Sequence, residues 1–235
     1  MNDTVSAAET AQAPATPSLA MLRTLGLVAA LSGFLVVLAY QITLPMIEEN
    51  KRIAIERALF KVVPGAVSRR DFLVTSTEVV PAGPDGTADG TKIYAGYDAE
   101  GELAGIALEA AAQGYQDVIR ILYGYDPGCQ CIRGIEVLKM AETPGIGDKI
   151  AKDPAFLKNF AALDARVNPT GDGLEHPIVS VKSGTKIDPW QIDAISGATI
   201  SSKAVARMLN DSAQAVLPTI NAHLGVLDRA SGETE

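Results

Sequence analysis

A run of 24 residues without a charged side chain, at positions 24–47, constrains this sequence more than any other feature. At about 1.5 Å of rise per residue, a helix of this length spans roughly 36 Å, more than the roughly 30 Å hydrocarbon core of a bilayer. The apolar part of a cleavable signal peptide is usually only about 7–15 residues long. Glu48 and Glu49 follow the run directly, with no small-residue cleavage site. We therefore predict an uncleaved transmembrane helix over residues 23–47.

The predicted span separates a short leading segment from a large polar body. Residues 1–22 are rich in Ala, Thr, Ser and Pro, and this composition predicts a disordered tail. Residues 48–66 carry charge pairs four positions apart beside an apolar stripe, which predicts a juxtamembrane helix. We assign residues 67–220 to one folded domain and residues 221–235 to a C-terminal tail.

The body combines strand patterns with a few helix patterns. Short apolar runs predict strands at residues 79–80, 92–97, 103–108, 118–123 and 132–140. The polar residues 98–102 predict a hairpin turn, and Val179 and Val181 are predicted to continue the same sheet. Asp153 followed by Pro154 predicts a helix start, and an amphipathic helix is predicted after Thr199. These elements favour the α+β class: a single N-terminal transmembrane helix followed by a mixed α+β domain.

Charge and cysteine content exclude several classes of function. The net charge is −8 and no basic stripe is present, so we expect no nucleic-acid partner. The two cysteines, Cys129 and Cys131, are too few for a disulfide framework or a complete zinc site. A strained disulfide and half of a shared metal site remain open for this pair. We favour two loop thiols without a special role, and we predict no metal site.

Residues 193–199, with the sequence Asp-Ala-Ile-Ser-Gly-Ala-Thr, form the first motif. Small residues at Gly197 and Ala198 leave the backbone open to close approach by a bulky group. Thr199 falls at a helix N-terminus, where free amides and the helix dipole suit a phosphate, and Lys203 adds a positive charge one turn later. The alternative is that Ser196 or Thr199 only caps the helix.

Residues 142–149, with the sequence Glu-Thr-Pro-Gly-Ile-Gly-Asp-Lys, form the second motif. A proline and two glycines around one apolar residue predict a tight loop with exposed backbone donors. Such a loop can wrap a planar ligand. The alternative is an ordinary connection between a strand and a helix.

Taken together, these segments resemble the FMN-binding subunit family of the Rnf electron-transport complexes, RnfG. The related NqrC subunit of the sodium-pumping NADH:quinone reductase shares the pattern. The matching features are the N-terminal span, Gly114-Tyr115, residues 142–147 and residues 193–199, in family order over about residues 20–215. The residues Gly147-Asp148-Lys149 and the modest length favour RnfG over NqrC.

The resemblance implies that a magnesium-dependent flavin transferase, which uses FAD, esterifies the Thr199 hydroxyl to the phosphate of FMN. Thr199 is then an attachment point, and the chain has no catalytic residue and is not a catalyst alone. The ring of a cofactor does the redox chemistry while the protein orients it. The implied cofactor-binding residues are Thr199 (covalent), Asp193, Ser196, Gly197 and Ala198 in the turn, Glu142, Thr143, Gly145, Ile146 and Gly147 against the ring, and Tyr115, Ser183, Gly184 and Lys203 around it.

The same resemblance implies a setting for the chain. Its partners would be the other membrane and iron–sulfur subunits of an Rnf-type complex, which couples ferredoxin/NAD electron transfer to ion translocation, together with the lipid bilayer. The flavin domain would lie on the periplasmic side of the bacterial cytoplasmic membrane. The basic residues Lys51, Arg52 and Arg57 predict the opposite orientation, but a domain this large lies outside the reach of that charge rule. An NqrC-type subunit and a cofactor-free anchored binding module are the alternatives.

Overall fold

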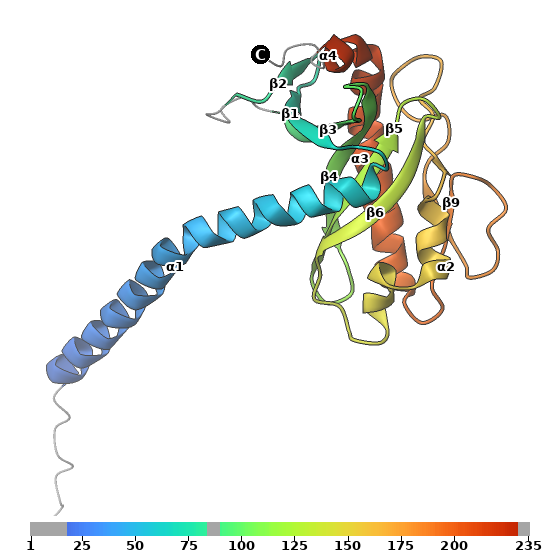
Figure 1. Cartoon of the computed structure of the whole chain (residues 1–235). Helices are drawn as coiled ribbons and strands as arrows, with labels where there is room; N and C mark the ends of the chain where they lie inside the picture. Colours follow the sequence, from blue (N-terminus) through green and yellow to red (C-terminus); the bar gives the residue numbers. More distant parts are fainter. Residues whose placement is uncertain (1–17, 84–89, 230–235) are drawn as a thin grey trace, which may run out of the picture. The chain divides into compact units, whose positions relative to one another are not determined.

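A computed structural model of the chain describes residues 18–83 and 90–229 (Figure 1). The chain divides into two compact units, residues 1–51 and residues 52–235.

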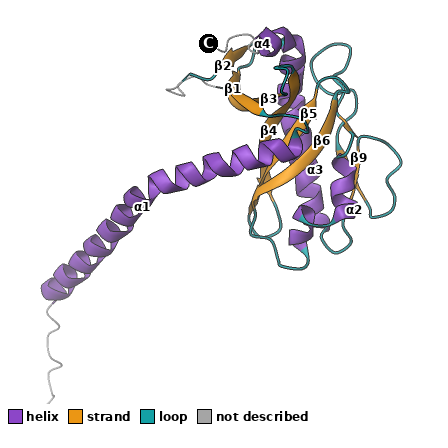
Figure 2. Cartoon of the chain, in the orientation of Figure 1, coloured by secondary structure: helices purple, strands orange, loops and turns teal. Residues whose placement is uncertain are grey.

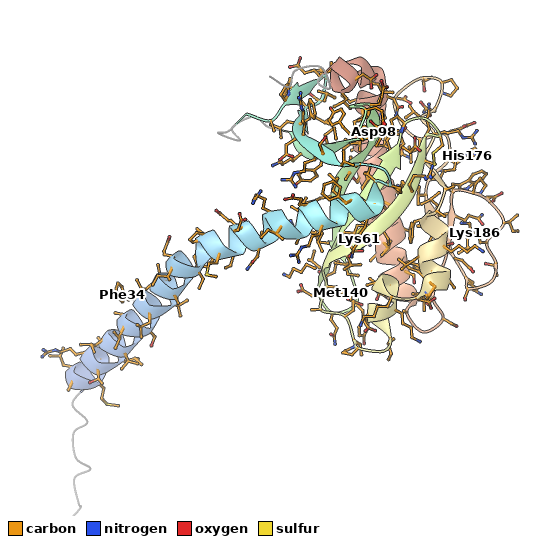
Figure 3. All side chains as sticks on the ribbon, viewed as in Figure 1. Phe34, Lys61, Asp98, Met140, His176 and Lys186 are labelled. Carbon is orange, nitrogen blue, oxygen red and sulfur yellow. A yellow bond between two sulfur atoms is a disulfide. The ribbon has the colours of Figure 1, made fainter. Side chains whose placement is uncertain are left out.

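The described residues of the first unit form the apolar part of one helix, α1 (Ser18–Val62), which includes Pro45 and whose last turns belong to the second unit. This part is long and apolar enough to cross a membrane, and none of its most apolar window is buried within the structure. Phe34, labelled in Figure 3, is 62% exposed and illustrates this apolar surface. The predicted apolar helix is therefore present. It begins within the predicted tail, and residues 1–17 of that tail lie outside the described residues.

The second unit is built on a seven-stranded sheet in which every neighbouring pair of strands is antiparallel. The order across the sheet is β2-β1-β3-β4-β5-β6-β7. The bounds are β1 (Ser68–Val74), β2 (Val79–Pro81), β3 (Thr91–Tyr97), β4 (Leu103–Gln113), β5 (Val118–Asp126), β6 (Cys131–Lys139) and β7 (Leu163–Asp164). The predicted hairpin is confirmed, because Asp98 pairs with Glu102 through its backbone amide at 3.0 Å between β3 and β4.

Helix α3 (Thr199–Ala222) packs along one face of the sheet and closes the main core (Figure 2). Its predicted apolar face is confirmed, since Val205, Met208, Leu209, Ala213 and Val216 are all buried. The short helix α2 (Pro154–Leu157) begins where predicted, with the Asp153 carboxylate accepting from the amides of Ala155 and Phe156. Two 3-10 helices, η1 (Gly147–Ala151) and η2 (Lys158–Phe160), flank α2.

The last turns of α1 cover the opposite face of the sheet. Ala58, Leu59, Val62 and Val63 are buried there against Tyr94, Ala107 and Leu122 of the central strands. A second, smaller apolar cluster therefore lies on the side of the sheet away from α3. The mixed α+β class predicted from the sequence is confirmed.

Three expectations differ from the structure. Val179 and Val181 do not extend the large sheet, because β8 (Val179–Val181) pairs in parallel with β9 (Gln191–Asp193) in a separate two-stranded sheet. A disulfide joins Cys129 and Cys131, whose Cα atoms are 5.2 Å apart, so these residues are not the two free thiols that we favoured. The tight turn between β5 and β6 brings their side chains together, and Gln130 between them has a φ of 49°.

The third difference concerns the predicted C-terminal tail. Helix α3 extends through Ala222, and α4 (Leu224–Arg229) follows it. Leu227 is completely buried, and the Tyr97 hydroxyl donates a hydrogen bond of 2.8 Å to its carbonyl. Burial of an apolar side chain with a satisfied backbone group fixes this segment on the domain. Residues 230–235 lie outside the described residues.

Candidate functional site

The turn at residues 193–199 connects β9 to α3. Gly197 has a φ of 86°, a left-handed conformation that a residue without a Cβ adopts at little cost. Ala198 is the N-cap of α3, and no side chain caps the first turn. Thr199 is the first helical residue and is exposed, and its hydroxyl has no hydrogen-bond partner among the described residues.

Neither Ser196 nor Thr199 therefore caps α3 with its side chain. Ser202, one turn into α3, stabilises the turn instead. Its hydroxyl donates to the Ala198 carbonyl at 3.0 Å and accepts from the Ile195 amide at 3.1 Å. The first amides of a helix have no acceptor four residues earlier, so the N-terminus of α3 keeps donors and a positive dipole beside a free hydroxyl.

The loop at residues 142–149 is held by its own backbone. Met140, labelled in Figure 3, lies just before it, directly after the last residue of β6. The Thr143 carbonyl accepts from the amides of Ile146 and Gly147 at 3.2 and 3.0 Å. The Asp148 carboxylate accepts from the Gly145 amide at 2.7 Å. The hydrogen bond from Lys152 lowers the pKa of Asp148, which favours the ionised carboxylate that accepts from Gly145.

Glu142 connects this loop to two other segments. It is buried, with 6% of its surface exposed. One carboxylate oxygen, Oε1, accepts from the backbone amides of Tyr115 and Gln116 at 3.0 and 3.1 Å. The other oxygen, Oε2, accepts from the Ser201 hydroxyl on the first turn of α3. A single side chain thus joins the β4–β5 turn, the loop and the helix N-terminus.

These three segments enclose a cavity of about 570 Å³, within the size range of small-molecule sites. It is lined by Tyr115, Glu142, Thr143, Ile146, Gly147, Gly197, Ala198, Thr199, Ile200 and Ser201. The first eight of these are residues expected at the cofactor from the sequence. Ile200 and Ser201 were missed as site residues, although their positions directly after Thr199 on an amphipathic helix could have indicated them.

The other expected residues lie outside this cavity. Asp193, Ser196 and Ser183 line a second cavity of about 280 Å³. Gly184 donates its amide to the Asp193 carboxylate at 2.7 Å. Gly145 turns the loop with a φ of 75°, and Lys203 is exposed on α3; neither lines the first cavity.

Comparison with known proteins matches residues 114–214 to the family described as the FMN-binding domain. This range contains all three segments of the first cavity. The chain is 32% identical over 193 residues to the G subunit of the ion-translocating oxidoreductase complex of Methanosarcina acetivorans, covering 80% of this chain and 89% of that protein. The chain belongs to the RnfG family.

The chain is also similar to other G subunits of such complexes. The G subunit of the ion-translocating oxidoreductase complex of Shewanella piezotolerans is 29% identical over 77% of this chain and 80% of its own length. The G subunit of the Na⁺-translocating ferredoxin:NAD⁺ oxidoreductase complex of Acetobacterium woodii is 30% identical over 63% of this chain and 65% of its own length.

Two solved structures share the fold. Shewanella oneidensis NqrC aligns with a TM-score of 0.51 at 18% identity, covering 79% of this chain and all of that chain. The C subunit of the Na⁺-translocating NADH-quinone reductase of Parabacteroides distasonis aligns with a TM-score of 0.58 at 21% identity, covering 74% of this chain and 95% of that chain. At these identities the likeness concerns the fold alone.

The residues of the first cavity fit the chemistry of FMN. The free amides at the start of α3 suit a phosphate, and the exposed Thr199 hydroxyl lies beside them. Tyr115, Ile146 and Ile200 line the same cavity and are 64%, 50% and 53% exposed, so they offer apolar surface to a planar ring. Groups that suit an anion and apolar side chains that suit a ring therefore line one cavity.

Proposed function

We propose that this chain carries FMN through a phosphoester bond to Thr199 and serves as an electron-transfer subunit of an Rnf-type, ion-translocating membrane complex. The observation that carries the proposal is the free hydroxyl of Thr199, exposed at the uncapped N-terminus of α3 on the wall of a ligand-sized cavity. The name of the family model and the names of the RnfG relatives support the same cofactor and the same kind of complex.

In the proposed attachment, the Thr199 oxygen forms a bond to the phosphorus of the FMN half of FAD. The pyrophosphate bond of FAD breaks, AMP leaves, and the hydroxyl proton passes to a base of a separate flavin transferase. The amides of the first α3 turn would then stabilise the phosphate, while Ile146, Ile200 and Tyr115 hold the ring. When bound, FMN supplies the electron-transfer chemistry.

The covalent bond has a physical advantage in this setting. A linked cofactor stays at a high effective concentration between its electron donor and acceptor, whatever its redox state. In the proposed complex these partners are the other membrane and iron–sulfur subunits, which pass electrons between ferredoxin and NAD. The chain would hold its cofactor in place and would not turn over substrate alone.

We further propose that residues 52–235 lie on the periplasmic side of the cytoplasmic membrane. The disulfide between Cys129 and Cys131 supports this orientation, because disulfides persist in oxidising compartments and are rare in the cytosol. The apolar part of α1 would then anchor the domain in the bilayer.

The test is the intact mass of the full-length chain, co-expressed with a flavin transferase and then denatured. The wild type and Thr199→Ser should gain the mass of FMN less one water, because both keep a hydroxyl. Thr199→Ala should gain nothing while keeping its circular dichroism spectrum.

A matched control is Thr185→Ala, which removes a threonine hydroxyl that bonds to the Lys182 carbonyl outside the first cavity, and should stay modified. An unmodified wild type, with a transferase that modifies a second substrate protein, would overturn the covalent proposal. Modification that persists in Thr199→Ala would overturn the assigned position.

A further inference from the structure

The Glu142 carboxylate is a buried charge in the wall of the cavity that we assign to FMN. Its three hydrogen-bond donors are the amides of Tyr115 and Gln116 and the hydroxyl of Ser201. All three donors are neutral. Within residues 18–83 and 90–229, no lysine, arginine or histidine forms an ion pair with this carboxylate.

Two glycines enclose the carboxylate closely. A Cβ placed on Gly114 would lie 2.5 Å from Oε1, and a Cβ placed on Gly147 would lie 2.7 Å from Oε2. Both distances are shorter than non-bonded atoms allow, so the backbone itself packs around the two oxygens. This packing leaves no room for a cation beside the two oxygens. The negative charge of Glu142 therefore acts, without a nearby cation among the described residues, on groups in the cavity.

Joining the three segments does not by itself require a charge. A glutamine has nearly the same shape, and its carbonyl oxygen can accept from the Tyr115 and Gln116 amides. Its NH₂ group can donate to the Ser201 oxygen, because a hydroxyl accepts as well as donates. Burying a carboxylate costs more free energy than burying an amide. The connecting role alone therefore does not explain why this side chain is charged.

We propose that Glu142 is a positioning residue that also lowers the reduction potential of FMN in this cavity through its negative charge. The inference rests on the proposed function. Each electron added to a cofactor in the cavity meets a fixed negative charge in surroundings less polar than water, where the repulsion is stronger than in solution. The carboxylate therefore favours the oxidised cofactor and makes the reduced one a better electron donor.

The measurement is the midpoint potential of the full-length, FMN-loaded protein, obtained by spectroelectrochemical titration. Glu142→Gln keeps the hydrogen bonds and removes the charge. We expect its equilibrium to shift about tenfold or more toward the reduced form, which is about 59 mV upward for a one-electron step. Ser201→Ala keeps the charge and removes one donor, so its potential should fall or stay unchanged.

Asp148→Asn is the matched control, because this carboxylate belongs to the same loop, pairs with Lys152 and does not line the cavity. Its potential should shift by clearly less than that of Glu142→Gln, since a partly exposed and paired charge is screened. An equal shift would mean that net charge alone matters and would overturn the proposal.

Three further results would overturn it. The first is a potential of Glu142→Gln that is unchanged or lower. The second is an upward shift in both Glu142→Gln and Ser201→Ala, which would indicate a loosened cavity. The third is a folded Glu142→Gln that carries no FMN while the wild type does, which would make Glu142 a loading residue. A wild type without FMN instead refutes the proposed function before any potential is measured.

Discussion

Gly124 on β5 packs directly against the backbone of Val62 at the end of α1. A Cβ placed on Gly124 would be 1.9 Å from the Val62 carbonyl oxygen. The clash would be with backbone, which cannot rotate away. Gly124→Ala should therefore lift the last turn of α1 from the sheet and destabilise the domain by about 1–3 kcal/mol. Urea unfolding of the full-length protein in detergent, followed by circular dichroism, measures the change.

Gly134 supplies the control, since it pairs with Gly124 in the neighbouring strand β6. A Cβ there would lie 3.5 Å from the Val62 Cα atom, which is an ordinary contact. Gly134→Ala should change the unfolding midpoint much less. Equal effects of the two substitutions would mean that strand propensity, and not the contact with α1, determines the loss.

Asp193 stabilises the loop that precedes β9. Its carboxylate accepts from the amides of Gly184 and Thr185 at 2.7 and 3.3 Å. Hydrogen bonds to a charged group contribute about 1.5–3 kcal/mol each, so Asp193→Ala should speed hydrogen exchange at these amides by roughly tenfold or more. Exchange measured by mass spectrometry over residues 182–187 checks this.

Asp188→Ala is the comparison for that experiment, because this carboxylate bonds to the Gln191 side chain and not to the Gly184 amide. It should leave the exchange of Gly184 and Thr185 unchanged. If Asp193→Ala does not speed exchange there, these hydrogen bonds do not stabilise the loop.

Much of the fold follows from local patterns in the sequence. The uncharged run, the hairpin at Asp98 and the apolar face of α3 are each set by residues close in sequence, and each was predicted correctly. The pairing of Val179 could not be predicted. Two apolar residues in alternation indicate a strand, but they do not indicate which strand it pairs with. The helix at Leu227 was missed, because its contacts with the domain come from residues distant in sequence, such as Tyr97, 130 positions away.

The candidate site, like the fold, was predictable where it depends on local sequence and not where it depends on distant contacts. The turn that bears Thr199 and the loop after Glu142 were recognised as motifs, and the structure brings both to one cavity. What joins them could not be read from the sequence: Ser201 donates to Glu142 across 59 positions. Asp193 is also expected at the cofactor, and its carboxylate accepts from the Gly184 amide, a contact that the spacing of the motif does not predict.

Alkaline pH should destabilise the domain through its buried tyrosines. Burial raises the pKa of Tyr125 to about 12, and it also raises the pKa values of Tyr94, Tyr97 and Tyr123 above their ordinary range. The unfolded value is about 10. Because the folded state favours the neutral phenol, this stability is complete below pH 10 and is lost as the pH rises through the folded values.

Absorbance at 295 nm and circular dichroism, recorded from pH 9 to 12.5, test this expectation. The buried tyrosines should ionise over the same pH range in which the domain unfolds. Tyr125→Phe, which loses the hydrogen bond to Asn221 but cannot ionise, should weaken the fall in stability between pH 10 and 12. Ionisation of Tyr94, Tyr97, Tyr123 and Tyr125 while the domain stays folded would contradict the burial on which the prediction rests.

The Cys129–Cys131 disulfide yields a prediction about both chemistry and compartment. Protein isolated from the membrane and denatured without reductant should take up no thiol-alkylating reagent, and with reductant it should take up two equivalents. In the native protein under mild reductant, Cys129 should be alkylated first, because it is exposed while Cys131 is 6% exposed. Cys129→Ser leaves one thiol and should react without reductant after denaturation. Two equivalents taken up by the unreduced wild type would instead mean free thiols, and would remove the support that this disulfide gives to a periplasmic domain.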